Sequence, residues 1–345
     1  MGDEKMKHRS SNKSKMVTLV TVLLMVLTAC SNENGASPST SGSAEAAAGS
    51  KSAEVTVHIA RLGGISPLMI AEEKGWIDEA FAEKGAKVEW SNFTSGPPIL
   101  EALVSNRIDL SSMGDGAVIT GLANQLPFEI IGLLGDGKDL NTVIVPVNSA
   151  ISSVADLKGK TIGVAKGTTS HVYLIKILQS IGLSQDDVKQ INLQADDALA
   201  AFETGQLDAW ITLDPYVTLS VEQKKAKIIE VEGEFLAPLS MIARTGFAKE
   251  HPELVTEYLK VYQKTLDWQR DNLDEAAALY EKHSKMPASV IKTVLERSAN
   301  QLSAYTPEAL QAHEASSEIL LNNKFLKKKP DFAKAINNTF VEKLN

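Results

Sequence analysis

Apolar residues recur along this chain in two arrangements, at every second position or at every third to fourth position. Alternation and short apolar runs predict β-strands at 55–60, 88–93, 130–134, 161–165 and 188–193. Helical spacing, with Pro, Ser or Asp near the start, predicts helices at 67–74, 99–104, 171–180 and 195–203. Strands that alternate with helices are typical of parallel sheets built from βαβ units.

Two stretches about a hundred residues apart share one pattern. In each, an aliphatic residue precedes an Asp, and a second Asp follows six positions later. The pairs are Asp109 with Asp115, and Asp208 with Asp214. The order of strands, turns and helices before them is also the same, so we expect two similar lobes. A repeat that occurs only twice does not indicate a solenoid.

Apolar strands at 140–147 and 236–244 lie between the halves and after the second half. A chain that enters one lobe, passes to the other and returns would cross twice, at these strands. We therefore predict an α/β protein whose first lobe comprises residues 54–140 plus 243–345 and whose second comprises 141–242. The last hundred residues are expected to be mostly helical, with starts near Pro287, Pro307 and Pro330.

The N-terminus predicts a targeting segment. Five basic residues precede the apolar run 16–27, which is too short to span a bilayer and ends in Leu-Thr-Ala-Cys. This ending resembles a bacterial lipobox, so we expect a signal peptide at 1–29 and a lipid on Cys30. The alternative is a stray thiol. Cys30 is the only cysteine, so a disulfide is excluded, and 30–53 has the composition of a flexible tether.

Charge narrows the choice of partner. The full chain has 35 Lys and Arg against 43 Asp and Glu. Without residues 1–29 these become 30 and 41, a formal charge of −11. Such a surface argues against a nucleic-acid partner. It also means that an anionic ligand must be held by local groups.

In open parallel sheets, ligands bind where strands end and the next helices begin. The turns at these places are rich in Gly, Ser and Thr: 61–66, 94–97, 114–116, 166–170 and 214–215. Free backbone N–H groups and the positive end of the helix dipole can hold an anion there without any basic side chain. Sulfonate, phosphate, nitrate and carboxylate all fit this chemistry.

Each candidate also has a structural interpretation. Ser66, Ser95 and Ser170 could simply be helix N-caps, and Asp109 and Asp208 turn residues. Asp115 and Asp214 follow apolar strands, so ligand contact and a structural role remain equally open for them. The same holds for His171, and the default for Arg61 is an exposed side chain. Trp210 lies within a strand and is expected to be core.

The sequence contains no Gly-x-Ser-x-Gly elbow and no His spacing typical of a metal site. We therefore expect no enzyme activity, no cofactor and no metal. Gly159-Lys160-Thr161 lacks the earlier Gly of a P-loop and leads into a strand, so we do not interpret it as one.

Several runs also resemble the aliphatic sulfonate-binding proteins of ABC importers. The run 152–160, Ser-Ser-Val-Ala-Asp-Leu-Lys-Gly-Lys, is shared with the wider superfamily of nitrate, taurine and thiamine-precursor binders. Lys-Gly-Thr-Thr-Ser-His at 166–171 and Asp-Ala-Trp at 208–210 with Asp214-Pro215 are closer to the sulfonate branch. The similarity covers 55–216 well and the helical tail only loosely.

The resemblance implies a type II periplasmic-binding-protein fold with two crossover hinge strands and a helical C-terminal region. It also implies ligand contacts, which would come from Ser95, Gly96, Gly114, Asp115, Thr168, Thr169, Ser170, His171 and Asp214. One turn departs from the family. Where sulfonate binders usually read Gln-Lys-Ser-Gly-Thr, this chain has Arg61 to Ser66, and we keep Arg61 and Ser66 as candidate contacts.

The functional hypothesis is a monomeric, lipid-anchored solute-binding protein on the outer face of the membrane, which delivers a small organic anion to an ABC permease. An aliphatic sulfonate is the expected ligand. The alternatives are taurine, nitrate or a thiamine or pyrimidine precursor, an enzyme of the same fold, or a sensor domain. The enzyme would need a catalytic His or Cys cluster and no lipobox.

Overall fold

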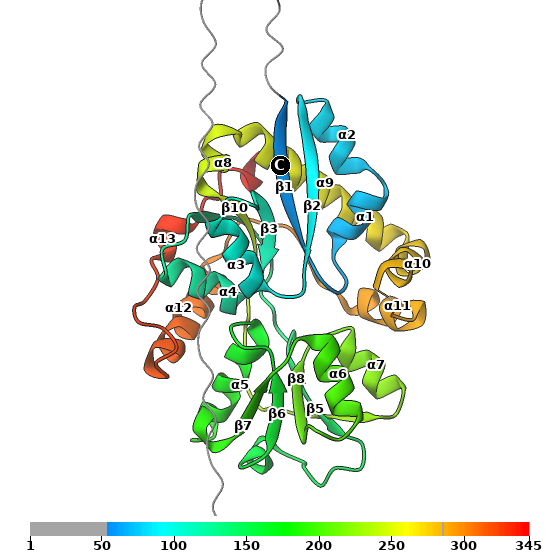
Figure 1. The fold of residues 1–345 in the computed structure, drawn as a ribbon, viewed down its shortest axis with the longest axis vertical. Coiled ribbons are helices and arrows are strands. Elements are labelled where there is room, and N and C mark those ends of the chain that lie inside the picture. Colours follow the sequence, from blue (N-terminus) through cyan, green and yellow to red (C-terminus); the bar gives the residue numbers. More distant parts are fainter. Residues whose placement is uncertain (1–53, 285, 345) are drawn as a thin grey trace, which may run out of the picture. The chain divides into compact units, whose positions relative to one another are not determined.

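A computed structural model describes residues 54–284 and 286–344. The predicted signal peptide, Cys30 and the tether lie outside these residues. Two five-stranded sheets organise the described chain (Figure 1). In spatial order, sheet 1 contains β2 (Ala86–Phe93), β1 (Val55–Leu62), β3 (Leu110–Met113), β10 (Leu239–Arg244) and β4 (Phe128–Gly135). Sheet 2 contains β7 (Lys189–Asn192), β6 (Thr161–Val164), β8 (Ala209–Thr212), β5 (Thr142–Pro146) and β9 (Ala226–Ile229).

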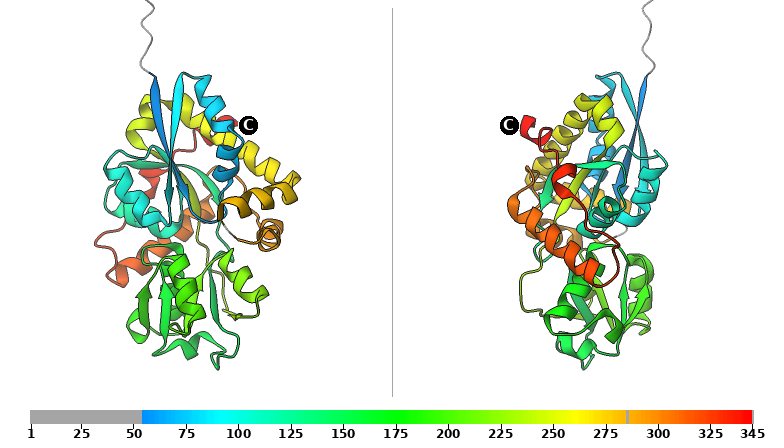
Figure 2. Two further views of the ribbon diagram at one scale, coloured as in Figure 1. Left: turned by 45° about the vertical axis from the view of Figure 1, so that its right-hand side comes forward. Right: turned by 90° about the vertical axis from the view of Figure 1, so that its left-hand side faces the viewer.

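Each sheet with its helices forms one lobe, and helices cover both faces of each sheet (Figures 1 and 2). The helices of lobe 1 are α1 (Pro67–Glu73), α2 (Trp76–Ala82), α3 (Gly96–Val104), α4 (Asp115–Ala123), α8 (Thr245–Glu250), α9 (Pro252–Asp271), α10 (Leu273–Ser284), α11 (Ala288–Arg297), α12 (Pro307–Asn322) and α13 (Phe332–Ala335). Those of lobe 2 are α5 (Thr169–Ser180), α6 (Ala195–Glu203) and α7 (Tyr216–Glu222). The predicted two-lobed α/β fold with a helical C-terminal region is confirmed.

Alternation along the strands places apolar side chains on both faces of each sheet. In β5, Val143 and Val145 pack on one face of sheet 2, against α5, while Ile144 packs on the other face with Trp210. This period of two is the geometry of an extended strand. Trp210 is 2% exposed, so its prediction as a core residue is confirmed.

The first Asp of each repeated pair, Asp109 or Asp208, makes the same hydrogen bond between strands in its lobe. Asp109 Oδ2 accepts the backbone N–H of His58 at 2.9 Å, and Asp208 Oδ2 accepts that of Thr161 at 2.7 Å. Each carboxylate therefore joins the start of one parallel strand to its neighbour. Asp109 is also buried, and its Oδ1 accepts from Arg244 Nε at 3.0 Å and from Arg244 Nη2 at 2.6 Å. Both residues serve the fold, as the structural interpretation expects.

The chain crosses between the lobes twice, before β5 and before β10. The crossings touch each other, because Ala237 N–H donates to Asp136 O at 2.9 Å. Gly137 has a φ of +68°, and a Cβ there would lie 1.9 Å from Ala237 O, so only glycine fits this position. All of β10 pairs within sheet 1, so the boundary expected between 242 and 243 falls inside this strand. We place the second crossing before Leu239.

Candidate functional site

Four helices that follow strands begin with Ser, Gly or Thr at the N-cap position. These residues are Ser66 before α1, Ser95 before α3, Gly114 before α4 and Thr168 before α5. None of them makes a side-chain cap to its own helix. Thr306, by contrast, accepts the Ala309 N–H at the start of α12. The N-cap interpretation therefore holds for the position of Ser66 and Ser95 but not for their side chains, while Ser170 lies inside α5.

Glycines bring three of these helix starts together across the lobe boundary. A Cβ on Gly116 of α4 would lie 2.5 Å from Thr168 O, and one on Gly114 would lie 2.3 Å from Thr169 Cγ2. A Cβ on Gly167 would lie 3.2 Å from Pro97 Cγ at the start of α3. The starts of α3 and α4 in lobe 1 therefore meet the start of α5 in lobe 2. Their positive dipole ends gather in one region, which favours an anion.

The donors of this region are mostly backbone groups and one hydroxyl. Pro97 and Pro98 have no N–H, so among its first three residues α3 can donate only from Gly96. The Gly116 N–H is already bonded to Asp115 Oδ1 at 2.7 Å. The first turn of α5 keeps the N–H groups that every helix start leaves unpaired. Ser95 Oγ is buried and has no hydrogen-bond partner among the residues that the structure describes, which normally costs free energy.

The hydroxyls of α5 point to partners within the protein. Thr168 Oγ1 donates to Ala165 O at 2.7 Å. Thr169 and Ser170 both donate to Asn141 Oδ1, at 3.1 and 2.9 Å. Asn141 lies directly before β5 and is buried, and its Nδ2 has no hydrogen-bond partner within the described part of the chain. The α5 start can therefore offer a ligand its backbone N–H groups more readily than its hydroxyl protons.

Asp115 occupies the first position of α4 and is fully buried. Burial raises the pKa of its carboxyl to about 6, although the positive charge of Lys176 acts in the opposite direction. Lys176 of α5 is itself 9% exposed and donates to Leu236 O at 2.7 Å. Burial lowers the pKa of its ammonium, while Asp115 raises it. Asp115 thus lies near the site, with its charge coupled to a lysine from the other lobe.

His171 contributes no positive charge at neutral pH. It is 1% exposed, and burial, followed by the charge of Lys166, lowers its pKa to about 4. Its Nδ1 accepts the Gly167 N–H at 3.4 Å, so Nε2 carries the proton. The ring packs edge-on against Phe325, with 5.0 Å between the ring centroids. The imidazole therefore links the turn before α5 to lobe 1.

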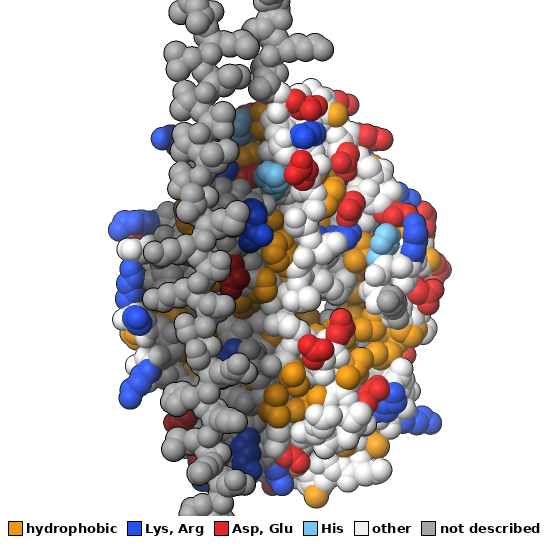
Figure 3. All heavy atoms as spheres, viewed as in Figure 1, with side chains coloured by type: hydrophobic (Ala, Val, Ile, Leu, Met, Phe, Trp, Pro, Cys, Tyr) orange, Lys and Arg blue, Asp and Glu red, His pale blue; other side chains and the backbone are white. Residues whose placement is uncertain are grey.

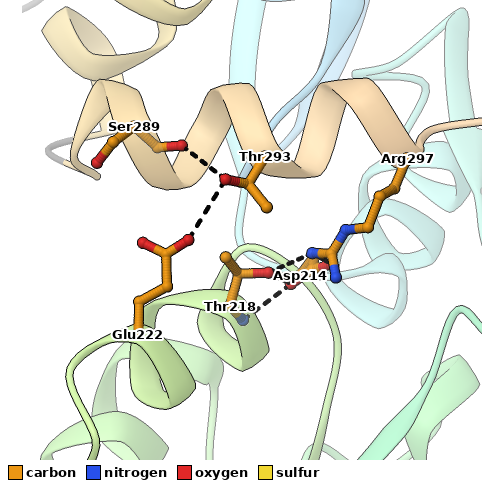
Figure 4. A network of polar contacts seen from close by, with 6 residues as sticks. All are labelled: Asp214, Thr218, Glu222, Ser289, Thr293 and Arg297. Atoms are coloured by element: carbon orange, nitrogen blue, oxygen red, sulfur yellow. Dashed lines mark hydrogen bonds and ion pairs between the residues drawn. The ribbon is translucent and has the colours of Figure 1, made fainter.

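Two of the predicted contact residues, Arg61 and Asp214, form ion pairs with other side chains of the protein. Arg61 Nε donates to Asn92 Oδ1 at 2.8 Å, and its guanidinium also pairs with Glu72. Asp214 accepts two hydrogen bonds from Thr218 and pairs with Arg297 of α11 (Figure 4). The structure therefore does not bring these two charges to the helix starts as unpaired groups.

Sequence reasoning missed three residues: Asn141, Lys176 and Arg297. Asn141 could have been noticed as a polar residue at the start of an apolar strand, and Lys176 as a charge within an apolar helix. Arg297 lies in the helical tail, where no motif singled it out.

Among residues 54–284 and 286–344, no cluster of His, Cys, Asp and Glu could hold a metal ion. The same residues contain no helix that is both long and apolar enough to cross a membrane.

Two α/β lobes joined by two crossings, with helix starts facing across the boundary, define a periplasmic-binding-protein fold. The solved structures agree. The Escherichia coli periplasmic aliphatic sulphonate binding protein SsuA is 26% identical, covers 83% of this chain and 92% of its own, and has a TM-score of 0.73. The alkanesulfonate-binding protein SsuA from Xanthomonas axonopodis pv. citri, bound to MOPS, is 24% identical, covers 82% and 98%, and has a TM-score of 0.75.

The chain belongs to the family described as NMT1/THI5 like, whose model matches residues 64–276. A Bacillus subtilis (strain 168) protein named for binding aliphatic sulfonates is 38% identical over 81% of this chain and 85% of its own length. The taurine-binding periplasmic protein of Escherichia coli (strain K12) is 31% identical over 60% and 64%. The chain is a solute-binding protein of this class. The desulfurization enzyme DSZB, at 15% identity and a TM-score of 0.59, shares the fold alone.

Proposed function

We propose that this protein is the extracytoplasmic, lipid-anchored solute-binding subunit of an ABC importer and captures an aliphatic sulfonate between its lobes. The proposal rests on the contact between the starts of α3, α4 and α5 across the lobe boundary. The side chains at the N-cap positions there make no hydrogen bond to their own helices. Such a region suits an oxyanion held by neutral donors. The names of the relatives support the choice of a sulfonate among oxyanions.

In this proposal the sulfonate oxygens accept from Ser95 Oγ, from the Gly96 N–H and from the N–H groups of Thr169, Ser170 and His171. Gly114 lets α4 approach α5, and Ser66 adds a further donor from the first turn. Binding closes the lobes because the ligand contacts both of them. A working dissociation constant of about 1 μM corresponds to roughly −8 kcal/mol.

Calorimetry with 1-pentanesulfonate, ethanesulfonate, taurine, nitrate, sulfate and a pyrimidine precursor tests the ligand. We expect the alkanesulfonates to bind most tightly. Binding of nitrate or the precursor without any sulfonate would refute the sulfonate assignment and leave the fold unaffected. Taurine as the tightest ligand would assign the chain to its second candidate, which the taurine-binding relative supports.

The anchor has a separate test. Mass spectrometry of the protein extracted from membranes should find a lipid-modified N-terminal cysteine at position 30. Cys30→Ala should release the protein from the membrane fraction. A protein that stays membrane-bound after this change would contradict the lipid anchor.

A further inference from the structure

Helices α7 of lobe 2 and α11 of lobe 1 face each other with matching polar rows (Figure 4). Thr218 and Glu222 are four residues apart on α7, and Thr293 and Arg297 are four apart on α11. Residues at this spacing share one helix face. Arg297 lies opposite Thr218 and Thr293 opposite Glu222, so the rows run antiparallel.

The two acceptors of the Arg297 contact bond each other within lobe 2. Asp214 Oδ1 accepts the Thr218 N–H at 3.0 Å and the Thr218 hydroxyl at 2.7 Å. Arg297 Nη2 then donates to Asp214 Oδ2 at 2.9 Å and contacts Thr218 Oγ1. The threonine hydroxyl can donate to Asp214 and accept from Arg297 at once. Asp214 and Thr218 thus form a preformed acceptor for a cation from the other lobe.

The second contact, between Thr293 and Glu222, can break at little cost in hydrogen bonding. Thr293 Oγ1 lies 3.3 Å from Glu222 Oε1 and 3.1 Å from Ser289 O of its own helix. A hydroxyl has one proton, so it bonds one of these acceptors at a time. When the lobes separate, Thr293 keeps Ser289 as a partner. Breaking this contact leaves no unsatisfied hydroxyl on α11.

An apolar layer lies beside the polar rows. Leu219 of α7 is 7% exposed and belongs to the same cluster as Ile291 and Leu295 of α11. Hydrophobic side chains gather where these helices meet (Figure 3). The polar contact is at the rim, because the Arg297 side chain is 57% exposed and that of Asp214 31%. Such an ion pair is weak, which suits a protein that must also release its ligand.

We propose that Asp214, Thr218 and Arg297, with Glu222 and Thr293 beside them, form an interlobe clasp that holds the closed state and sets how long a captured ligand stays. Arg297 and Asp214 are then positioning residues that act through lobe closure, not through contact with the ligand. The identity of the ligand in this inference rests on the proposed function.

Stopped-flow measurements with 1-pentanesulfonate, followed by tryptophan fluorescence, separate the two roles. Arg297→Gln should raise the dissociation rate about two- to fivefold and should not slow the association rate. Asp214→Asn keeps the acceptor for Thr218 and should have the same effect, and the double variant should add nothing further. High salt should speed dissociation in the wild type and not in Arg297→Gln.

Arg270→Gln is the matched control, because this side chain is 54% exposed and pairs with Asp267 inside lobe 1. It should leave both rates unchanged. A slower association for Arg297→Gln, with dissociation unchanged, would overturn the clasp and indicate that Arg297 attracts the anion. Unchanged rates in both clasp variants would also overturn it.

A ligand-independent measurement keeps the clasp testable if no sulfonate binds. Spin labels at Lys84→Cys in lobe 1 and Lys189→Cys in lobe 2, in the full chain with Cys30→Ser, report the distance between the lobes. Arg297→Gln should shift the distance distribution toward longer values. An unchanged distribution refutes the clasp, whereas absence of sulfonate binding by the wild type refutes only the proposed ligand.

Discussion

Gly116→Ala tests whether closure depends on the contact between α4 and α5. The new Cβ would lie 2.5 Å from the Thr168 carbonyl oxygen, whereas ordinary contact begins at 3.4 Å, so the lobes must separate there by about 0.9 Å. Both sides of the contact are backbone, so no side-chain rotation can relieve the overlap. Overpacking of this kind costs about 1–3 kcal/mol, which corresponds to a dissociation constant weaker by roughly 5- to 150-fold.

The same change should not weaken lobe 1 itself. Gly116 lies within α4, where alanine is favoured over glycine by about 0.5–1 kcal/mol. Calorimetry with 1-pentanesulfonate and thermal unfolding without ligand should therefore change in opposite directions. Affinity should fall while unliganded stability holds or rises. An affinity within twofold of the wild type would refute the reasoning.

Gly121→Ala on the same helix is the control. Its Cβ would lie 2.7 Å from Leu100 Cδ2 and from Phe128 Cε1, both inside lobe 1. This variant should lower the stability of the unliganded protein, because the overlap occurs in the core of one lobe. A loss of affinity without a loss of stability in this variant would show that the two effects cannot be separated along α4.

Ser95→Ala should weaken sulfonate binding by about 1.5–3 kcal/mol in calorimetry; unchanged affinity would remove Ser95 from the site, since its hydroxyl has no partner whose loss could compensate. Asp115→Asn should flatten the pH dependence of thermal stability. Burial raises the folded pKa of Asp115 from 3.8 to about 6, so its contribution is fully present below pH 3.8 and is lost as the pH rises through 6, by at most about 3 kcal/mol. An identical decline in the variant would contradict this. Asp109→Ala should lower the free energy of unfolding in urea by about 3–5 kcal/mol, because it leaves Arg244 without its ion-pair partner. Asp208 is exposed, so Asp208→Ala should lower it by about 1 kcal/mol. Equal losses would show that burial does not decide the difference.

Local pattern predicts most of the fold because strands and helices follow from side-chain periodicity. The expected strand at 55–60 is β1, and the helix expected at 195–203 is α6. The helix starts at Pro307 and beside Pro287 are also confirmed. Pro330 precedes α13 by two residues, with Asp331 as the N-cap. The repeated Asp pairs predict the two lobes, since the first Asp of each pair, Asp109 and Asp208, makes the same bond between strands.

The contacts between lobes could not be predicted in this way. Asp214 and Arg297 are 83 positions apart, and no periodicity relates one lobe's surface to the other's. The turn at Arg61 shows the same limit. Its charge suggests an anion contact, yet Asn92 and Glu72 engage it from neighbouring elements. Helix α2 was also missed, because its start carries no strong signal in the sequence.

The position of β10 between β3 and β4 has a consequence for the order of folding. Sheet 2 is built from one continuous stretch, from β5 to β9, so lobe 2 can complete its sheet as soon as residue 229 is available. Sheet 1 begins 87 positions before β5 yet lacks an interior strand until residues 239–244 arrive. During synthesis, when the N-terminus emerges first, the chain would therefore start lobe 1 first and complete it last. Until β10 inserts, β3 and β4 expose unpaired edges, which are a risk for pairing with other chains.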